Sequence, residues 1–295
     1  MRSFWPSIST IKHLRIPFSV FLMPIFSFAA ACSEQVNLLS YVEMFVILHV
    51  LVYPASNGYN SYYDRDEGSI GGLKHPPKVT EDLLYWSLAL DALALAYGWF
   101  RFGTLFALLL LVYGLASKAY SHPSIRLKKR TWISLFTIGF FQGSWTFLMV
   151  WQGLDQLSLS DITLPNVWWP ALLCFAFLSG SYPMTQIYQH KEDASRGDQT
   201  VSLRLGILGT FVFTGVCFLF TMAGFAVYFL KYFSIKELML FQIFLSPTLL
   251  FFMYWFWSAY RNPSKANFQN TMWLNLLSAL GMIGFFSWLM WTQQH

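Results

Sequence analysis

Charged side chains are scarce in this sequence. Asp, Glu, Lys and Arg make up 11% of the 295 residues, whereas about a quarter is typical of soluble domains. Hydrophobic residues account for 56% and aromatic residues for 20%. A large soluble helical protein with a very apolar core does not fit this composition, because its surface would need more charge. We therefore predict an all-α, polytopic membrane protein.

Cysteine is also sparse, and the positions of the cysteines exclude two common kinds of site. Cys32, Cys174 and Cys217 form no CxxC pair and no Cys/His cluster, so neither a redox motif nor a zinc site is expected. We interpret them as small apolar residues of the membrane interior. The net charge of +5 does not indicate a nucleic-acid partner, because the basic residues lie in loops between apolar segments.

Apolar runs of about twenty residues, the length that a helix needs to cross a bilayer, recur along the whole sequence. The first run follows Lys12 and Arg15. It has no convincing small-residue cleavage site, so we interpret it as a helix and not as a signal peptide. We predict a single domain, residues 1–295, with nine membrane spans. The expected spans are residues 16–33, 38–58, 82–99, 103–119, 132–152, 166–189, 207–230, 238–260 and 269–291.

The distribution of basic residues supports this count. Sixteen of the 19 Lys and Arg residues lie in the N-terminal segment or at and after the ends of spans two, four, six and eight. The other three, on the opposite side, are Arg101, Lys231 and Lys236. By the positive-inside rule, the N-terminus is cytoplasmic and the C-terminus is outside. We expect an integral protein of a bacterial-type inner membrane, surrounded by the lipid bilayer.

Eight of the 14 acidic residues fall in two of the cytoplasmic loops. One group follows span two, and the other follows span six. This spacing suggests an internal duplication of four-helix units, around residues 16–119 and 132–260. The loop after span four, within KAYSHPSIRLKKR, is strongly basic. One face of the membrane therefore carries two acidic patches and one basic patch.

The first acidic patch lies in the sequence SNGYNSYYDRDEG. If span two continues as a helix, Asn57, Asn60 and Asp64 share one face, and Glu67 falls on the same face. Asp66 points the opposite way unless the helix has already ended. Amide and carboxylate oxygens are ligands that suit Mg²⁺, so we predict a metal site here. The alternative is a solvated helix end whose acids pair with nearby basic residues.

The second acidic patch follows span six, in the sequence QHKEDASRGDQT. Gln189, Asp193 and Gly197 are spaced i, i+4 and i+8 on one helical face, and Glu192 lies beside Gln189. Arg196 is close to the same line, where it could bind phosphate or pair with a carboxylate. We predict Gln189, Glu192 and Asp193 as metal ligands that face those of the first patch.

Two such patches facing each other across a cavity would hold a pair of Mg²⁺ ions. The ions would neutralise a diphosphate and help it to leave, while lysine and arginine side chains take the remaining oxygens. Ionisation of an allylic diphosphate creates a carbocation, and aromatic faces can stabilise a cation. Asp64 and Asp193, one in each patch, are the residues that we expect to be essential for catalysis.

The first patch resembles the leading motif of the UbiA superfamily of intramembrane prenyltransferases, an Asn three residues before N-D-x-x-D-x-x-x-D. Here Asn57 precedes NSYYDRDEG, in which Asn60 and Asp64 match. Ser61 and Gly68 replace two of the family's aspartates. These departures suggest an atypical branch of the family, in which a neighbouring acid of the patch supplies the missing carboxylate.

The second patch is similar to the family's D-x-x-x-D-x-x-x-G motif, which is followed by T and a short run to L-G. Gln189 replaces the first Asp, and Glu192 is a candidate substitute. The matching positions are Asp193, Gly197, Thr200 and Gly206. The stretch YSHPSIRLKK, after span four, resembles the family's Y-S/T-x-P-x-x-L-K segment. The candidates for binding the substrate diphosphate are therefore Asn57, Lys118, Tyr120, Arg126, Lys128 and Arg196.

The resemblance implies nine transmembrane helices around a central cavity. It also implies that two Mg²⁺ ions hold an isoprenyl diphosphate, whose polyprenyl group passes to an aromatic or other lipid-precursor acceptor within the membrane. Acceptor, chain length and oligomeric state stay open. So do two other functions: a catalytically weak or inactive member that acts as a binding or scaffold protein, and a cation-coupled transporter, which would place its site near the bilayer midplane.

Overall fold

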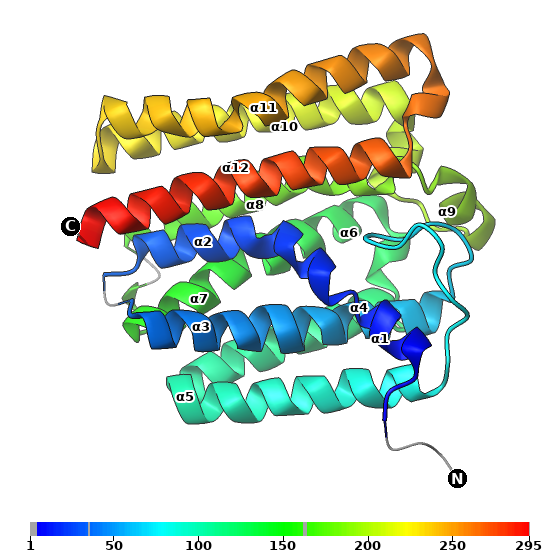
Figure 1. Cartoon of the computed structure of the whole chain (residues 1–295), viewed down its shortest axis with the longest axis horizontal. Helices are drawn as coiled ribbons and strands as arrows, with labels where there is room; N and C mark the ends of the chain where they lie inside the picture. Colours follow the sequence, from blue (N-terminus) through cyan, green and yellow to red (C-terminus); the bar gives the residue numbers. More distant parts are fainter. Residues whose placement is uncertain (1–4, 35, 162–163, 295) are drawn as a thin grey trace.

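The structure, a computed structural model, describes residues 5–34, 36–161 and 164–294. In this part of the chain the elements are helices, apart from one isolated β-bridge between Ile70 and Leu73. Figure 1 shows most helices running along one common direction, with the two ends of the chain at opposite ends of the bundle. Backbone polar groups cannot stay unpaired in lipid, so a bundle of helices is the arrangement that a membrane requires of this composition.

The N-terminal part of the chain forms two long helical rods, which correspond to predicted spans one and two. Arg15 interrupts the first rod, because its backbone adopts a left-handed conformation with φ 48° and ψ 42°. The first rod consists of α1 (Ile8–Leu14), a 3₁₀ segment (Ile16–Leu22) and α2 (Met23–Cys32). The second rod consists of α3 (Leu38–Phe45), a π-helical segment (Val46–Val52) and α4 (Tyr53–Asp64).

The next element, α5 (Asp82–Ser121), is 40 residues long. A straight helix of this length would extend about 60 Å, roughly twice the thickness of a bilayer core. Gly103 interrupts it with φ 88° and ψ 179°, a conformation that glycine adopts without a steric penalty. The two arms then fold back on each other, so that Lys118 forms an ion pair with Asp91. Predicted spans three and four are the two arms of this hairpin.

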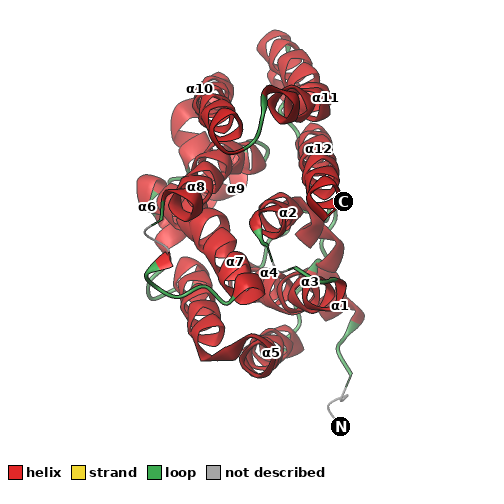
Figure 2. Ribbon diagram, turned by 90° about the vertical axis from the view of Figure 1, so that its left-hand side faces the viewer, coloured by secondary structure: helices red, strands yellow, loops and turns green. Residues whose placement is uncertain are grey.

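The remaining helices complete the bundle. Figure 2, which looks along it, places the α5 hairpin at one edge and α10 with α11 at the opposite edge. Between them, α2 packs against both α7 and α12. The elements are α6 (Thr131–Thr137), a π-helical segment (Ile138–Trp145), α7 (Thr146–Asp155), α8 (Pro165–Gln186), α9 (His190–Arg196), α10 (Val201–Tyr232), α11 (Ile235–Arg261) and α12 (Phe268–Gln294).

Within the described residues, seven continuous helical stretches are long and apolar enough to cross a membrane. The α5 hairpin counts once among them, although it contains two predicted spans. The α8 helix, predicted as span six, has prolines at positions 170 and 183 and is not among the seven. The all-α membrane fold is therefore confirmed, and the count of nine is supported approximately. The internal duplication stays a prediction.

Aromatic rings form much of the core near the end of the bundle that carries the C-terminus. Phe28 of α2 stacks on Phe286 of α12 with 4.5 Å between ring centroids. Phe225 of α10 packs against Phe241 of α11 at 4.7 Å. Large apolar side chains also point outward, as Phe220 does with 74% of its surface exposed. This arrangement suits a helical bundle that packs aromatic groups inside and presents others to lipid.

Candidate functional site

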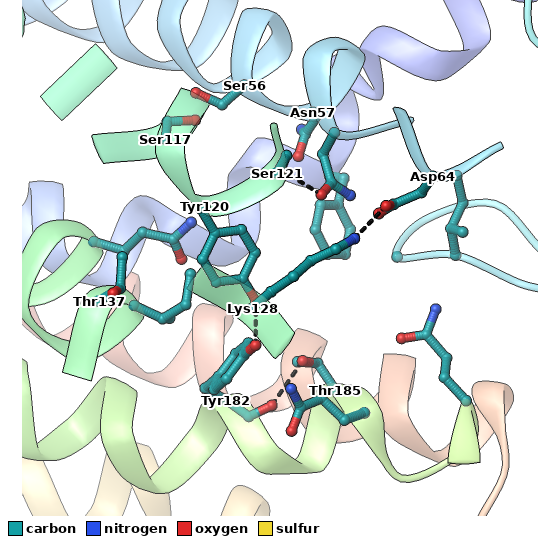
Figure 3. A pocket seen from close by; sticks show the side chains of 18 of the residues that line it. Ser56, Asn57, Asp64, Ser117, Tyr120, Ser121, Lys128, Thr137, Tyr182 and Thr185 are labelled. Carbon is teal, nitrogen blue, oxygen red and sulfur yellow. Dashed lines mark hydrogen bonds and ion pairs between the residues drawn. The ribbon is translucent and has the colours of Figure 1, made fainter. Parts of the chain in front are cut away.

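A cavity of about 300 Å³ lies among α4, α5, α6, α8, α9 and the 3₁₀ segment after α1. Figure 3 shows that side chains from these elements converge on it, with Asp64 and Lys128 at one end. In the described part of the chain, its charged lining residues are Arg15, Asp64, Asp66, Lys128, Asp193, Arg196 and Asp198. The predicted site residues that line it are Asn57, Asn60, Asp64, Asp66, Tyr120, Lys128, Gln189, Asp193 and Arg196.

The first acidic patch reaches the cavity from the last turns of α4 and from the loop that follows. The helix ends at Asp64, because Arg65 adopts a left-handed conformation with φ 49° and ψ 45°. The loop then carries the Asp66 side chain into the cavity, where it is buried. Glu67 is exposed and does not line the cavity. The helix therefore ends before Glu67, and the prediction that Glu67 faces the metal site is wrong. Asp66, the other predicted candidate, lines the cavity, as expected if the helix ends before it.

The second patch lies on a short helix that is separated from α8 by a turn. α8 ends at Gln186 and α9 begins at His190, so the expectation that span six continues unbroken into the patch is wrong. Gln189, Asp193 and Gly197 still follow one helix, because Gln189 and Gly197 are the caps of α9. Gln189 nevertheless lines the cavity, and its Nε2 donates a hydrogen bond to the backbone oxygen of Ser69 at 3.1 Å. Asp193 also lines the cavity and is 9% exposed.

Glu192 does not line the cavity and is partly exposed. Its carboxylate lies against the backbone of Gly68, in the space that a side chain at that position would fill. Ser61, the other departure from the family's first motif, is buried and does not line the cavity. The replacements at these two positions therefore remove no carboxylate from the set that lines the cavity.

The two carboxylates of the first patch that line the cavity, Asp64 and Asp66, are each paired with a basic side chain. Lys128, 8% exposed, forms an ion pair with Asp64, and Arg196 forms one with Asp66. Arg126 donates from Nε and Nη2 to the two oxygens of Asp198 at 3.1 and 3.0 Å. The Asp198 carboxylate raises the pKa of Arg126 through these bonds. These predicted basic residues thus lie beside acidic side chains of the site, although Arg126 does not itself line the cavity.

Lys118 is the exception among the predicted basic residues. It pairs with Asp91 between the two arms of α5, and its ammonium lies 5.0 Å from the centroid of the Tyr59 ring. Neither Lys118 nor Asp91 lines the cavity. The fold-back at Gly103 explains this, because it turns the end of α5 toward its own first arm. The structure does not bring Lys118 to the diphosphate site predicted for it.

This placement gives a direct test. If the cavity binds the isoprenyl diphosphate and Mg²⁺ that the resemblance implies, Lys118→Met is expected to leave the dissociation constant of that diphosphate unchanged. Lys128→Met should weaken its binding by about tenfold through the loss of a charge-assisted contact. Isothermal titration of the two purified variants measures both constants. Equal losses in the two variants would show that Lys118 reaches the diphosphate after all.

Tyr120, predicted from the basic segment, lies on the cavity wall with its hydroxyl against that of Tyr182. Ser134 Oγ lies 2.9 Å from the Tyr182 hydroxyl and completes the network. Tyr182 belongs to α8 and also lines the cavity. It was not singled out from the sequence, since one tyrosine within an aromatic-rich span carries no distinguishing signal.

Two further charged residues were not predicted. Asp198, 3% exposed, follows Gly197 of the second motif directly and could have been inferred from that neighbourhood. Arg15 reads as an ordinary basic residue at the cytoplasmic end of a span. Its guanidinium is buried and donates to the backbone oxygen of Gly71 at 3.2 Å and to Oδ1 of Asn57 at 3.2 Å. No carboxylate lies within 4.0 Å of it among the described residues.

The burial of Asp193 affects its protonation. Burial raises the pKa of this carboxyl to about 6, although the hydroxyl of Thr200 donates a hydrogen bond to it at 3.0 Å. The folded pKa thus exceeds the ordinary value of 3.8. The ionised carboxylate therefore destabilises the metal-free fold in full above pH 6. The cost falls progressively as the pH drops from 6 to 3.8 and is gone below the unfolded pKa of 3.8.

Asp193→Asn should consequently raise the melting temperature of the metal-free protein at pH 7.5 and change it much less at pH 5. The amide keeps an oxygen that can accept the hydrogen bond from Thr200. Intrinsic tryptophan fluorescence during thermal unfolding measures the effect at the two pH values. A variant that loses stability equally at both would contradict the shifted pKa.

The donor set of the cavity fits Mg²⁺. It combines the carboxylates of Asp64, Asp66 and Asp193 with the amide groups of Asn60 and Gln189, and oxygen ligands of this kind are those that Mg²⁺ prefers. Within the described residues, no three acidic, His or Cys side chains already form a metal cluster. Binding of the ion would therefore require the carboxylates to exchange their basic partners for it.

Comparisons with known structures identify the fold. The chain shares its fold with a UbiA homolog from Archaeoglobus fulgidus bound to GPP and Mg²⁺, at 17% identity and a TM-score of 0.67, over 96% of this chain and 99% of that one. A structure of a UbiA homolog from the same organism bound to DMAPP and Mg²⁺ has 16% sequence identity and a TM-score of 0.67, again over 96% of this chain and 99% of that one. The structure of a digeranylgeranylglyceryl phosphate synthase has 15% sequence identity and a TM-score of 0.61, over 96% of this chain and 98% of that one.

No curated protein matches the sequence significantly. The sequence model of the UbiA prenyltransferase family, in contrast, matches residues 21–290. This range extends from the 3₁₀ segment of the first rod to the last turns of α12 and so includes both acidic patches. The chain belongs to the UbiA prenyltransferase family.

Proposed function

We propose that this protein is a Mg²⁺-dependent prenyltransferase that moves a polyprenyl group from an isoprenyl diphosphate to an acceptor within the membrane. One observation carries the proposal: acids and amides from the ends of α4 and α9 and the loops beside them, together with basic side chains, line the same cavity. Family membership supports it, as do the relatives bound to GPP or DMAPP with Mg²⁺.

The acids would hold the metal, as two ions that bridge to the diphosphate. Asp64 and Asp66 would serve from the first patch and Asp193 from the second, with amide oxygens of Asn60 and Gln189 completing the set. When bound, Mg²⁺ neutralises the diphosphate and stabilises it as a leaving group. Asn60 is held in place for this role, because Ser121 Oγ donates a hydrogen bond to its Oδ1 at 2.7 Å.

The basic residues would take the diphosphate oxygens that the metal leaves free. Lys128 and Arg196 are already beside the acids, so a short movement transfers them from carboxylate to phosphate. Arg15 has no carboxylate within reach in the described part of the chain. Its buried guanidinium interacts with the carboxylates of Asp64 and Asp66 only from beyond ion-pair distance, so a diphosphate oxygen would give it a closer negative partner. We assign Arg15 to the diphosphate, beside Asn57.

In the transfer, the bond between C1 of the prenyl group and the diphosphate oxygen breaks, and its electron pair leaves with the diphosphate. The acceptor then gives an electron pair to C1 and releases a proton. Tyr120 and Tyr182 line the cavity near Lys128, where aromatic rings can stabilise the transient cation.

The sidedness of the protein is part of the proposal. The N-terminal end and the loop after α4 lie at the same end of the bundle, and the C-terminal end lies at the other (Figure 1). With the distribution of Lys and Arg, this supports a cytoplasmic N-terminus and active site in a bacterial-type inner membrane. A cation-coupled transporter is favoured less, because the acids gather where α4 ends and not at mid-helix.

An inactive scaffold is also favoured less, because Asp64, Asp66 and Asp193 all line the cavity despite the departures at positions 61 and 68. The test is lipid mass spectrometry of three kinds of membrane: with the gene, without the gene, and with a gene that encodes the double variant Asp64→Ala, Asp193→Ala. We expect a prenylated lipid that disappears when the gene is deleted and also when the protein is replaced by the folded double variant. A lipid profile that is the same in all three would refute the proposal, provided that no second enzyme makes the product.

A further inference from the structure

A second cavity, of about 380 Å³, lies at the end of the bundle opposite to the candidate functional site. Figure 1 places the end of α2, the end of α12 and the turn between α10 and α11 together at this end. The ends of membrane-spanning helices lie at the level of the lipid headgroups, so the cavity lies where headgroups are found. Its lining residues are Ala31, Cys32, Ser33, Glu34, Trp151, Asn166, Tyr228, Tyr232, Phe233, Met290 and Gln293.

Aromatic rings form a large part of this lining. Trp151 comes from α7, and Tyr228, Tyr232 and Phe233 come from the end of α10. Trp and Tyr are common at headgroup level, but here they line a cavity together with a carboxylate. Aromatic faces attract ammonium groups within about 6 Å. The Tyr232 ring already does so on the protein itself, because the Lys231 ammonium lies 5.2 Å from its centroid.

The charge of the second cavity also favours a cation. Glu34 carries the only charge among the described residues that line it. No basic side chain lies within 4.0 Å of this carboxylate in the described part of the chain. The side-chain amides of Asn166 and Gln293 add oxygens that can accept hydrogen bonds. An ammonium group therefore meets a carboxylate, amide oxygens and aromatic rings, whereas an anion meets a like charge.

Asp155, at the end of α7, ties two walls of this cavity together. Its carboxylate accepts hydrogen bonds from Ser33 Oγ and from the backbone N–H of Glu34, the latter at 3.1 Å. It also accepts one from the indole Nε1 of Trp151 at 2.7 Å. These contacts hold the acidic wall beside an aromatic wall. A site with walls fixed in this way loses less conformational freedom when a ligand binds.

Two lysines flank the turn between α10 and α11, beside the cavity-lining Phe233. Lys231 and Lys236 are exposed, and neither pairs with a carboxylate within 4.0 Å among the described residues. They are two of the three Lys and Arg residues assigned to this side of the membrane. The third, Arg101, is paired with Glu43. A ligand that carries a phosphate next to its ammonium group would find these lysines beside the cavity.

We propose that the second cavity binds the headgroup of a zwitterionic phospholipid with a primary ammonium group, of the phosphatidylethanolamine type. The ammonium group would lie among Glu34, Trp151 and Tyr232, and the phosphate would lie beside Lys231 and Lys236. A lipid is favoured over a soluble amine, because both charges of its headgroup meet opposite charges at headgroup level. A bound headgroup would join the ends of α2, α7 and α10 and so stabilise the fold.

The experiment uses the purified full chain in detergent with three probes: dihexanoyl phosphatidylethanolamine, dihexanoyl phosphatidylglycerol and free ethanolamine. Native mass spectrometry measures binding of the two lipids, and the rise in melting temperature measures all three. We expect the ethanolamine lipid to bind about fivefold or more tightly than the glycerol lipid, because only the former brings an ammonium group to the rings and to Glu34. Free ethanolamine should bind more weakly than the lipid, since it lacks the phosphate.

The variants Glu34→Gln and Tyr232→Leu should each weaken binding of the ethanolamine lipid about fivefold. Tyr232→Phe keeps the aromatic face and should bind it normally. The double variant Lys231→Gln, Lys236→Gln should weaken binding of the lipid and leave free ethanolamine unaffected. Glu67→Gln is the matched control for Glu34→Gln, because it removes the same charge from an exposed glutamate at the other end of the bundle and should change neither affinity.

Equal binding of the two lipids to the unmodified protein would overturn the inference, whatever the variants do. A preference for the ethanolamine lipid that persists in both Glu34→Gln and Tyr232→Leu would place the headgroup elsewhere and would also overturn it. Free ethanolamine that binds as tightly as the lipid would show that the cavity takes a soluble amine, and the assignment to a phospholipid would be wrong.

Discussion

Asp64→Asn is expected to lower Mg²⁺-dependent prenyl transfer by about a hundredfold or more, as the loss of one strong electrostatic group in an active site often does. Asp64 is the acid at the end of α4, with a side chain that is 4% exposed and paired with Lys128. The substitution keeps the shape of the side chain and removes the charge that would hold the metal. Transfer from radiolabelled geranyl diphosphate, measured across a Mg²⁺ titration, gives the effect.

The control for this prediction concerns folding, because the change leaves Lys128 buried without its partner. Such a loss can cost about 3–5 kcal/mol of stability. The double variant Asp64→Asn, Lys128→Met removes both charges and should recover stability without recovering activity. If the double variant transferred prenyl groups at the normal rate, Asp64 would be a structural residue and the metal assignment would be wrong.

The second large effect is a contrast between neighbours. Asp66→Ala is expected to reduce transfer by about a hundredfold, whereas Glu67→Ala should leave it nearly unchanged. Asp66 is buried in the cavity lining and pairs with Arg196, while Glu67 is exposed. The two variants remove equal charges one residue apart, so each is the matched control of the other in the same transfer assay.

The opposite order of effects would have a specific meaning. If Glu67→Ala were the damaging change, α4 would have to continue past Arg65 when substrate binds, which would swing Glu67 onto the face of Asn60 and Asp64. Circular dichroism does not resolve one helical turn. Accessibility of single cysteines placed at positions 66 and 67 to a soluble thiol reagent, with and without diphosphate and Mg²⁺, would locate the helix end directly.

This pair of acids shows how far the sequence could predict the site. Helical spacing correctly grouped Asn57, Asn60 and Asp64, because α4 remains regular up to Asp64. It failed at the next residue, since the helix ends on Arg65 in a left-handed conformation that non-glycine residues adopt rarely. Nothing in the local sequence marks an arginine for that conformation.

The same limit applies to the basic residues. Lys128 follows from the family's pattern, whereas Lys118 was a candidate only from its position at the inner end of span four, and of the two Lys128 lines the cavity and Lys118 does not. The difference arises from the Gly103 fold-back, which gives Lys118 a partner in Asp91. Span positions, by contrast, were predicted well, because the length and hydrophobicity that a membrane demands are local properties of the chain.

The hairpin of α5 bears on how the protein enters the membrane during synthesis. An isolated Asp at the centre of a span costs about 2.5–3.5 kcal/mol at the translocon. The first arm of α5 carries one, Asp91, whose partner Lys118 lies near the end of the second arm. Their ion pair exists only when both arms are present. The first arm alone is therefore poorly suited to partition into lipid. We expect it to insert stably only after the second arm has been synthesised, so that the two arms of α5 insert together.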